Sequence, residues 1–320
     1  MRLILKKTVI GSFPRIHHSL DDSIKTIIDL QLANKIDIIS DGEQRYDMIG
    51  YFHQIPGLID EKGKLCIGKK IQSLDEINEF EKISDFIFSS DYINKLASDV
   101  SIKTALTGPI TLGMTCAMNG IKSHYTSVLD TRIYEDISLA IQPIIIRLLE
   151  LGSLVQIDEP GLSGGFMNPE IAIKIINNML EKSIKKEKWQ DKLSIHVCGA
   201  MSRVNNLFEN LLNLNASVLS LAFSGNIEKE NLKIISKKDI EKASKKIGFG
   251  CIGTEVSKIN DVDNDIEIIK RLEEISRLID LNNVAYVHPD CGFRNNSIDV
   301  VERILRNLSS SVDSFLERYS

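Results

Sequence analysis

A histidine and two cysteines stand where they could bind a metal ion together. His196 and Cys198 lie two residues apart at the end of an apolar run, so on a strand both side chains project from the same face. Cys291 follows a second apolar run, which also ends in a glycine turn. Imidazole and thiolate are preferred zinc ligands, and three protein ligands leave a fourth position for a substrate. These residues therefore predict a catalytic zinc site.

The remaining cysteines and histidines are predicted to have other roles. His288, shortly before Cys291, is expected to pack or to hydrogen-bond behind the metal ligands. The adjacent His17 and His18 are predicted to lie in a surface loop. A lone cysteine in an apolar run usually fills the core. Three cysteines fit that description: Cys66, Cys116 and Cys251.

Length and charge restrict the class of protein. The chain has 320 residues, 43% of them hydrophobic, and a formal net charge of -5. This composition is typical of a globular protein and gives no reason to expect nucleic acid or an anionic membrane as a partner. No apolar run approaches the roughly 20 residues that span a bilayer, and the first residues lack a signal-peptide pattern. We therefore expect a cytoplasmic protein with reduced thiols.

Apolar, β-rich runs alternate with amphipathic helical runs along the chain. Eight such units predict an α/β fold of the (β/α)8 TIM-barrel type, with parallel strands joined by right-handed crossovers. The predicted strands are Thr8–Phe13, Ile36–Ser40, Ser101–Leu106, Ser153–Ile157, Leu193–Val197, Ser217–Leu221, Ile247–Ile252 and Val284–Val287. The predicted helices are Leu20–Asn34, Leu129–Leu151, Asn168–Ser183, Lys238–Lys246, Asp263–Ile279 and Ile298–Arg318. A doubly wound fold is disfavoured, because no dinucleotide-binding glycine pattern follows the first strand.

The chain is predicted to form one barrel domain over residues 1–320. Its longest connection, residues 51–99, is expected to be an insertion with its own helix near the mouth of the barrel. No internal repeat, linker or low-complexity segment interrupts the sequence.

Polar residues gather just after the predicted strands, where barrel enzymes place their active sites. Ser12 lies at the end of the first strand, Asp41 and Glu43 follow the second, Asp158 the fourth and Glu255 the seventh. On one barrel mouth they would surround the metal site with carboxylates. Simpler interpretations stay open, because Asp commonly caps loops and a glutamate after a glycine can be solvated.

Six motifs at these strand ends form a family pattern. They are Ile10-Gly11-Ser12-Phe13-Pro14, Asp41-Gly42-Glu43-Gln44-Arg45, Leu106-Thr107-Gly108-Pro109, Gln156-Ile157-Asp158-Glu159-Pro160, His196-Val197-Cys198-Gly199 and Pro289-Asp290-Cys291-Gly292. Together they resemble the catalytic barrel of cobalamin-independent methionine synthase, in its short single-barrel form. The resemblance spans nearly the whole chain.

The resemblance implies zinc-dependent transfer of a methyl group to the thiol of homocysteine, which forms methionine. By motif, His196, Cys198 and Cys291 match the zinc ligands. The chemistry is consistent, because the thiolate is the nucleophilic form of a thiol and a bound metal ion deprotonates it. Transfer of the methyl group is then chiefly a matter of positioning.

The resemblance also implies how homocysteine is held. Glu43 and Asp158 match the carboxylates that bind its amino group, and Ile10 and Ser12 match a turn whose backbone contacts the amino acid. Two carboxylates would reject thiols that lack an ammonium group, because their charge would be left unpaired.

Two positions depart from the family pattern. Ala222 stands where the family places a glutamate ligand of the metal, and Glu255 stands where it places a histidine acid. Two hypotheses follow: Glu255 becomes the fourth ligand, or the site keeps three protein ligands and an open position. We favour the second, because three protein ligands suffice for catalytic zinc. Glu255 remains the candidate catalytic acid, and Asp158 is the second candidate catalytic residue.

The methyl donor is predicted from what the sequence lacks. The region 107–119 contains no Trp that could stack on a pterin, and no acidic residue closely follows Pro160. A methylcorrinoid, delivered free or by a corrinoid protein as partner, is therefore expected rather than methyltetrahydrofolate. 

Two other functions remain as alternatives. One is methyl transfer to another thiol such as coenzyme M, which Glu43 and Asp158 disfavour because that thiol is anionic. The other is a catalytically altered paralogue that binds zinc and an amino acid. Ala222 and Glu255 keep the second alternative open.

Overall fold

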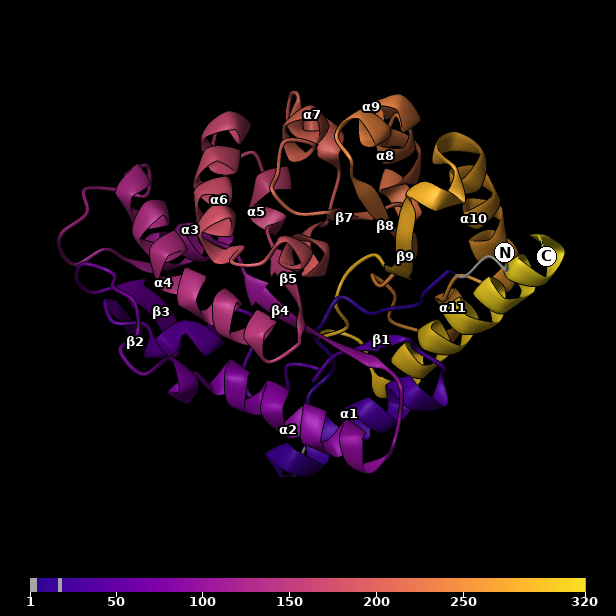
Figure 1. Cartoon of the computed structure of the whole chain (residues 1–320), viewed down its shortest axis with the longest axis horizontal. Helices are drawn as coiled ribbons and strands as arrows, with labels where there is room; N and C mark the ends of the chain where they lie inside the picture. Colours follow the sequence, from indigo (N-terminus) through magenta and orange to yellow (C-terminus); the bar gives the residue numbers. More distant parts are fainter. Residues whose placement is uncertain (1–4, 17–18, 320) are drawn as a thin grey trace.

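The computed structural model describes residues 5–16 and 19–319, and it consists of a ring of parallel strands enclosed by helices (Figure 1). His17 and His18 lie outside the described residues. The main sheet has the order β1-β4-β5-β6-β7-β8-β9. Its strands are β1 (Ile38–Ile39), β4 (Ser101–Thr107), β5 (Leu154–Asp158), β6 (Leu193–Val197), β7 (Val218–Ala222), β8 (Lys246–Ile252) and β9 (Val284–Pro289).

A short segment before the first helix joins the two edges of this sheet. Lys7 forms a parallel bridge with Val287 of β9, and Thr8 forms one with Ile38 of β1. The eighth strand position is therefore filled by two bridging residues, and the predicted TIM-barrel fold is confirmed. The predicted strand Thr8–Phe13 was too long, because the chain leaves the sheet after Thr8 and turns across the mouth of the barrel.

Helices cover the outside of the ring, as expected for parallel strands with crossover connections (Figure 1). They are α1 (Leu20–Ala33), α2 (Glu81–Lys95), α3 (Pro109–Asn119), α4 (Thr131–Glu150), α5 (Pro160–Ser163), α6 (Pro169–Ser183), α7 (Leu207–Leu211), α8 (Glu228–Ile234), α9 (Lys237–Lys242), α10 (Asp265–Ile279) and α11 (Ile298–Tyr319). The apolar face of α4 shows why such helices form, since Ile133, Ile137 and Ile144 recur at helical spacing and are fully buried.

Two of the helix predictions need correction. The helix expected over Lys238–Lys246 ends at Lys242, because Ser244 adopts a left-handed conformation (φ 53°) and Lys246 begins β8. The helices α3, α5, α7 and α8 were not predicted; α3 starts directly at a strand end, and its Thr111, Gly113 and Thr115 favour a helix only weakly.

The long connection between β1 and β4 contains a hairpin and one full helix. The hairpin strands are β2 (Leu58–Glu61) and β3 (Lys64–Ile67), which pair in antiparallel fashion. β3 packs on α3, whereas α2 packs against α1 and β4 within the outer layer. Short 3-10 helices also occur: η1 (Gly50–Gln54), η2 (Ile77–Glu79), η3 (Glu187–Lys192), η4 (Met201–Arg203), η5 (Gly225–Ile227), η6 (Ile259–Asp261) and η7 (Leu281–Asn283).

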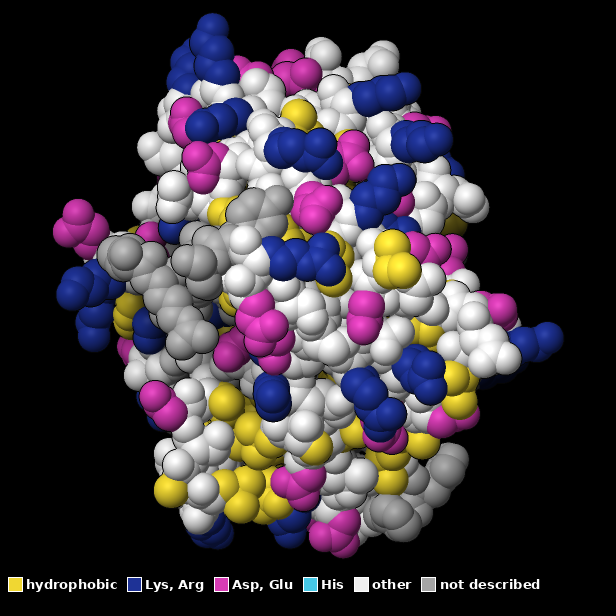
Figure 2. Space-filling model, turned by 90° about the vertical axis from the view of Figure 1, so that its right-hand side faces the viewer, with side chains coloured by type: hydrophobic (Ala, Val, Ile, Leu, Met, Phe, Trp, Pro, Cys, Tyr) yellow, Lys and Arg dark blue, Asp and Glu magenta, His cyan; other side chains and the backbone are white. Residues whose placement is uncertain are grey.

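The outer surface carries charges of both signs. Figure 2 shows Lys and Arg side chains interspersed with Asp and Glu over the face that contains α10 and α11. None of the described helices combines the length and apolar character needed to cross a bilayer.

A buried carboxylate fixes the turn between β4 and α3. Glu159, fully buried after β5, accepts hydrogen bonds from the backbone N–H groups of Ile110 (2.9 Å) and Thr111 (2.8 Å). These two N–H groups belong to the first turn of α3, which has no helical partner for them. The chain can approach so closely only because Gly108 lacks a side chain: a Cβ atom there would lie 2.2 Å from Oε1 of Glu159.

We therefore expect Gly108→Ala to displace Glu159 and to lower the free energy of unfolding by about 1–3 kcal/mol, the usual cost of overpacking. Urea unfolding followed by circular dichroism measures the change. Gly164→Ala is the matched control, because its nearest neighbour would be an ordinary 3.4 Å away. Equal stabilities of the two variants would contradict this account of the turn.

Candidate functional site

The three predicted metal ligands meet at the carboxyl ends of β6 and β9. His196 lies within β6, Cys198 directly follows it, and Cys291 lies two residues beyond β9. One ligand atom from each residue lies within 4.8 Å of the other two. His196 is only 2% exposed, while the two cysteines are partly accessible from the barrel mouth. Among the described residues this is the one group of His, Cys, Asp or Glu side chains with such spacing.

A hydrogen-bonded chain behind His196 sets the orientation of its ring. Nδ1 of His288 lies 2.8 Å from the carbonyl oxygen of Pro289, which can only accept, so Nδ1 carries a proton. Burial lowers the pKa of His288 to about 3, so its Nε2 is an acceptor, and the Ser220 hydroxyl lies 3.0 Å from it. The Ser220 oxygens then accept from Nδ1 of His196, at 3.1 Å each. His288 thus supports the histidine ligand, as the sequence predicted.

This series of hydrogen bonds engages Nδ1 of His196 and leaves Nε2 as the free nitrogen of the ring. The atom is buried and has no hydrogen-bond partner among the described residues. A buried polar atom without a partner is unfavourable, and a metal ion would satisfy it. The orphaned nitrogen therefore fits the metal site that the sequence predicts.

The two thiols are unequal in the absence of a metal ion. A hydrogen bond between them lowers the pKa of Cys291 and raises the pKa of Cys198, and His196 lowers the pKa of Cys291 further. The cluster therefore presents thiolate character beside an imidazole nitrogen. This donor set is suited to zinc, which prefers sulfur and nitrogen ligands.

A cavity of about 560 Å³ opens above the cluster. Its lining includes the two thiols, Cys198 and Cys291, together with Ala222 and Glu255. Ala222 is the last residue of β7 and is 1% exposed, and its methyl group offers no ligand atom to a metal ion. Glu255 is exposed and lies outside the group of ligand atoms.

Asp158 lies next to His196 because the two residues are paired across β5 and β6. Burial, and to a smaller extent the negative charge of Glu43, raise the pKa of Asp158 to about 7. Its Oδ1 accepts a hydrogen bond from Nε2 of Gln156 at 2.7 Å. No cation lies within 4.0 Å of this carboxylate among the described residues, so it is available to an ammonium group.

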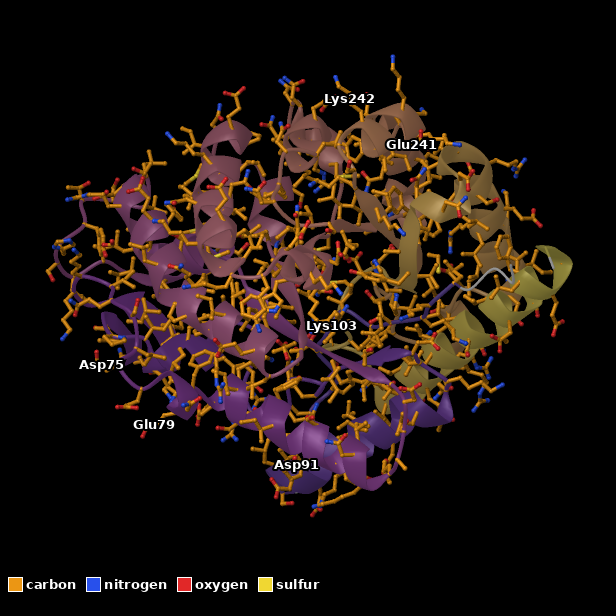
Figure 3. All side chains as sticks on the ribbon, in the orientation of Figure 1. Asp75, Glu79, Asp91, Lys103, Glu241 and Lys242 are labelled. Carbon is orange, nitrogen blue, oxygen red and sulfur yellow. The ribbon has the colours of Figure 1, made fainter. Side chains whose placement is uncertain are left out.

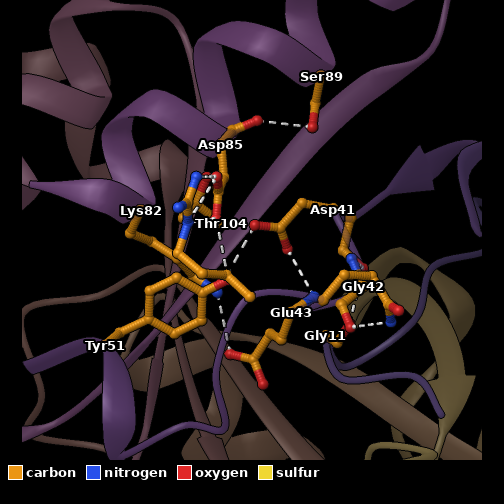
Figure 4. A network of polar contacts seen from close by, with 12 residues as sticks. Gly11, Asp41, Gly42, Glu43, Tyr51, Lys82, Asp85, Ser89 and Thr104 are labelled. Carbon is orange, nitrogen blue, oxygen red and sulfur yellow. Dashed lines mark hydrogen bonds and ion pairs between the residues drawn. The ribbon is translucent and has the colours of Figure 1, made fainter. Parts of the chain in front are cut away.

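Glu43 is in a different electrostatic situation. It follows Gly42, adopts a left-handed conformation (φ 52°) and is 4% exposed. Its carboxylate is 3.1 Å from the Nζ atom of Lys82, a helical lysine that is 1% exposed (Figure 4). Arg294 approaches the other oxygen at 4.0 Å. The charge of Glu43 is thus largely compensated within the protein.

Lys82 belongs to a wider polar network under the mouth (Figure 4). Its Nζ atom lies 3.7 Å from Asp41 and 4.0 Å from the centre of the Tyr51 ring. The Tyr51 hydroxyl donates to Asp85 at 3.0 Å, and Asp85 also pairs with Arg45 at 2.7 Å. Asp41 therefore has Lys82 as an ion-pair partner.

The turn that follows the bridging residue Thr8 also reaches the site. The carbonyl oxygen of Ile10 accepts from Nε2 of Gln156 at 2.9 Å. Ser12 packs on the turn that carries Cys291: a Cβ atom on Gly292 would lie 2.1 Å from the Ser12 hydroxyl oxygen, and Phe293 N–H donates to the Ser12 carbonyl at 2.7 Å. Both predicted residues therefore lie close to other predicted site residues.

The remaining cysteines are buried away from this cluster, as predicted: Cys66 (2% exposed), Cys116 (0%) and Cys251 (0%). Sequence reasoning missed Lys82 and Ser220. Lys82 resembles any lysine of an amphipathic helix, and only packing shows that it turns inward. Ser220 sits at a position of β7 that alternates inward with Ala222, which is the one signal that places it at the site.

These features define a class of protein: a (β/α)8 enzyme with a candidate thiolate metal centre at the carboxyl ends of its strands. Residues 5–313 match the family model described as cobalamin-independent synthase, catalytic domain. The chain therefore belongs to this family, which confirms the resemblance predicted from the motifs.

Relatives of similar length are found in archaea. The chain is 29% identical to a methionine synthase of Methanocaldococcus jannaschii, covering 94% of this chain and 90% of that protein. It is 28% identical to a methionine synthase of Methanothermobacter marburgensis, with 96% and 93% covered. An Arabidopsis thaliana protein named 5-methyltetrahydropteroyltriglutamate–homocysteine methyltransferase 1 is 25% identical, and there the match covers 95% of this chain but 42% of the plant protein.

Solved structures share the fold. A B12-independent methionine synthase from a Shewanella species superposes with a TM-score of 0.76 at 17% identity, over 99% of both chains. A protein from Listeria monocytogenes described as a vitamin-B12-independent methionine synthase gives 0.72 at 20% identity, over 98% of this chain and 96% of that one. 

The expected donor has to be corrected at this point. A methylcorrinoid, and with it a corrinoid protein as partner, was inferred from the absence of a Trp and of an acidic residue. The family to which the chain belongs is described as independent of cobalamin. That expectation therefore loses its support, since absent residues in one loop do not define a donor site.

The chain behind His196 predicts a measurable effect on metal binding. Ser220→Ala removes the hydroxyl between the two histidines, and we expect roughly a 10–100-fold loss of zinc affinity, as is usual when a group that orients a ligand is removed. Competition with a chromophoric chelator measures the affinity. Cys291→Ser should weaken binding further, while Ser194→Ala, two residues before His196 on β6, is the control without effect. Unchanged affinity in Cys291→Ser would contradict the metal site.

Proposed function

We propose that this protein is a zinc-dependent methyltransferase that moves a methyl group to the thiol of homocysteine and so forms methionine. The observation that carries the proposal is the placement of the cluster His196, Cys198 and Cys291 directly beside Asp158 on the neighbouring strand. One arrangement thus offers a site for a thiol and a site for an ammonium group. The names of the archaeal relatives support this acceptor.

The acceptor is bound at its two ends. Asp158 receives the ammonium group, with Glu43 adding negative charge nearby although Lys82 compensates most of it. Ile10 and Ser12 line the opposite side of the amino acid through their backbone. This division assigns the larger share of ammonium recognition to Asp158, since it has no cation of its own among the described residues.

His196, Cys198 and Cys291 hold the metal ion. Zinc bound there stabilises a thiolate at neutral pH, where a free thiol with a pKa of about 8.5 is mostly protonated. The chain would contribute three ligands, so a further position on the metal ion would be available to the acceptor sulfur. Cys198, Cys291 and Ala222 line the same cavity, through which the sulfur would approach.

We assign the donor as a methylated tetrahydropteroylglutamate, in keeping with the name of the plant relative and with a cobalamin-independent family. The methyl group leaves a tertiary nitrogen of that donor for the sulfur, and the nitrogen then needs a proton. Glu255 is exposed and lines the same cavity, so we assign to it the delivery of this proton from solvent. Glu255 is therefore assigned as the acid and not as a metal ligand.

Turnover tests this proposal directly. The zinc-loaded protein should form methionine from homocysteine and methyltetrahydropteroylglutamate, detected by mass spectrometry. Glu255→Gln should lower kcat by about 100-fold or more, the usual contribution of a general acid, with unchanged zinc affinity. Lower zinc affinity in this variant would instead make Glu255 a ligand. Turnover with coenzyme M but not with homocysteine, or zinc binding without turnover on any thiol, would overturn the proposal.

Specificity for the amino group tests the role of Asp158. Asp158→Asn removes the negative charge but keeps the shape, and we expect KM for homocysteine to rise about 10–100-fold, because a hydrogen bond to a charged group contributes about 1.5–3 kcal/mol. Initial rates over a range of homocysteine concentrations give KM. Propanethiol lacks the ammonium group, so its slow methylation should be unaffected. An equal loss with both thiols would argue against ammonium recognition.

A further inference from the structure

A lysine lies inside the barrel, beneath the candidate site. Lys103 of β4 is 2% exposed, and Figure 3 shows it near the centre of the molecule, while the other labelled charged residues lie at the periphery. Burial of an ammonium group is unfavourable unless it is paired. No carboxylate lies within ion-pair distance of it among the described residues. Its Nζ atom donates to Oε1 of Gln156 at 2.6 Å and lies 5.4 Å from the centre of the Tyr286 ring.

The amide of Gln156 is fully engaged. Gln156 is completely buried on β5, and its Nε2 donates to the Asp158 carboxylate at 2.7 Å and to the Ile10 carbonyl at 2.9 Å. A lysine can only donate, whereas a carboxylate and a carbonyl can only accept. The amide therefore has one orientation that satisfies all three partners. Lys103 holds the oxygen end, and the nitrogen end faces the site.

The register of the sheet explains how this connection arises. Ala105 of β4 is paired with Gln156 of β5, and Lys103 with Leu154, so the inward side chains of both strands form successive layers inside the barrel. Asp158 stands one layer nearer the mouth than Gln156. A lysine side chain from the layer below is long enough to reach the amide without reaching the substrate.

The two acceptors of this amide are both part of the proposed homocysteine site. Asp158 receives the ammonium group, and Ile10 belongs to the turn on the other side of the amino acid. These two acceptors come from distant parts of the sequence: Ile10 is 146 positions from Gln156, whereas Asp158 is its near neighbour on β5. One side chain therefore fixes the distance between the two halves of the acceptor site.

We propose that Lys103 and Gln156 are positioning residues for the acceptor amino acid, and that they act by holding the Asp158 carboxylate and the Ile10 carbonyl in place from below. This inference rests on the proposed function, because it takes the bound group to be an α-amino acid. Neither residue touches the acceptor. With one Oδ1 lone pair occupied by Gln156, the remaining carboxylate oxygen is directed to the ammonium group.

The hydrogen bond from Lys103 persists in either protonation state. Burial lowers the pKa of Lys103 to about 7, yet a neutral amine donates to Oε1 as an ammonium group does. The geometry of Gln156 therefore does not depend on the charge of Lys103.

Two nearly isosteric variants test the proposal in the full-length, zinc-loaded protein. Lys103→Met removes the donor to Oε1, and Gln156→Met removes both donors to the site. We expect KM for homocysteine to rise by about 10-fold or more in each, as expected when hydrogen bonds that orient a charged group are lost, with kcat and zinc affinity nearly unchanged. The dissociation constant of methionine, measured by calorimetry, should rise by the same factor.

A purely structural role predicts a different result. A partly unfolded variant would lose kcat in proportion to its inactive fraction, without a change in KM. Lys245→Met is the matched control: Lys245 is also a buried lysine and donates to the Leu214 carbonyl at 2.5 Å, but it precedes β8 at the opposite end of the barrel. This control should leave KM unchanged.

The outcomes separate the two proposals. Unchanged KM and unchanged methionine binding in both variants would overturn the positioning role while the proposed function stands. Weaker methionine binding in the variants, in a protein that transfers no methyl group from the pteroylglutamate donor, would support the positioning role and refute the proposed donor. A wild-type protein that binds neither homocysteine nor methionine would overturn both.

Discussion

The parallel register of three strands is the constraint on which the rest of the site depends. Asp158 is paired with His196 across β5 and β6, and His196 is paired with Ser220 across β6 and β7. Because paired residues of a parallel sheet project to the same side, a carboxylate, an imidazole and a hydroxyl stand in one row inside the barrel. The row orients the imidazole from one side and places the Asp158 carboxylate, the proposed ammonium-binding group, on the other. The loops then need to add only the two thiols, Cys198 and Cys291, and the walls of a cavity.

Buried charge is distributed unevenly around this row. Lys82 and Arg294 compensate Glu43, and Arg45 compensates Asp85, whereas Asp158 is held by a neutral amide. An unpaired buried charge is unfavourable. A carboxylate that is already paired with Lys or Arg therefore gains less from binding a cationic group of a ligand. Among the described residues, Asp158, beside the candidate metal cluster, shares the lack of a cation with Glu159 and Asp290, but those two carboxylates accept hydrogen bonds from backbone N–H groups, whereas the donor to Asp158 is the Gln156 amide. This difference supports the proposed assignment of ammonium recognition to Asp158.

The short side chain of Ala222 does not loosen the end of β7. Asp290 accepts hydrogen bonds from the N–H groups of Phe223 and Ser224, both at 3.0 Å, and the amide of Asn231 donates to the Ala222 carbonyl at 2.8 Å. The backbone around the open position is therefore fixed from two directions. An open coordination position on a rigid frame suits a ligand that arrives from outside, which is the role that the proposed function gives to the acceptor sulfur.

The sequence alone determined the fold class, the family and the three residues, His196, Cys198 and Cys291, that form the candidate metal cluster. The reason is local: a His and a Cys two apart on a strand share a face, glycine turns end the strands, and eight alternating units leave few topologies. Only the tertiary structure decided what surrounds them. Lys82, Ser220 and Lys103 act through partners 24 to 68 positions away in the chain, and neither composition nor periodicity fixes such contacts. Packing likewise made Glu43 a compensated charge and placed Glu255 at the rim of the cavity, because side-chain burial and charge pairing depend on all the elements that meet at the barrel mouth.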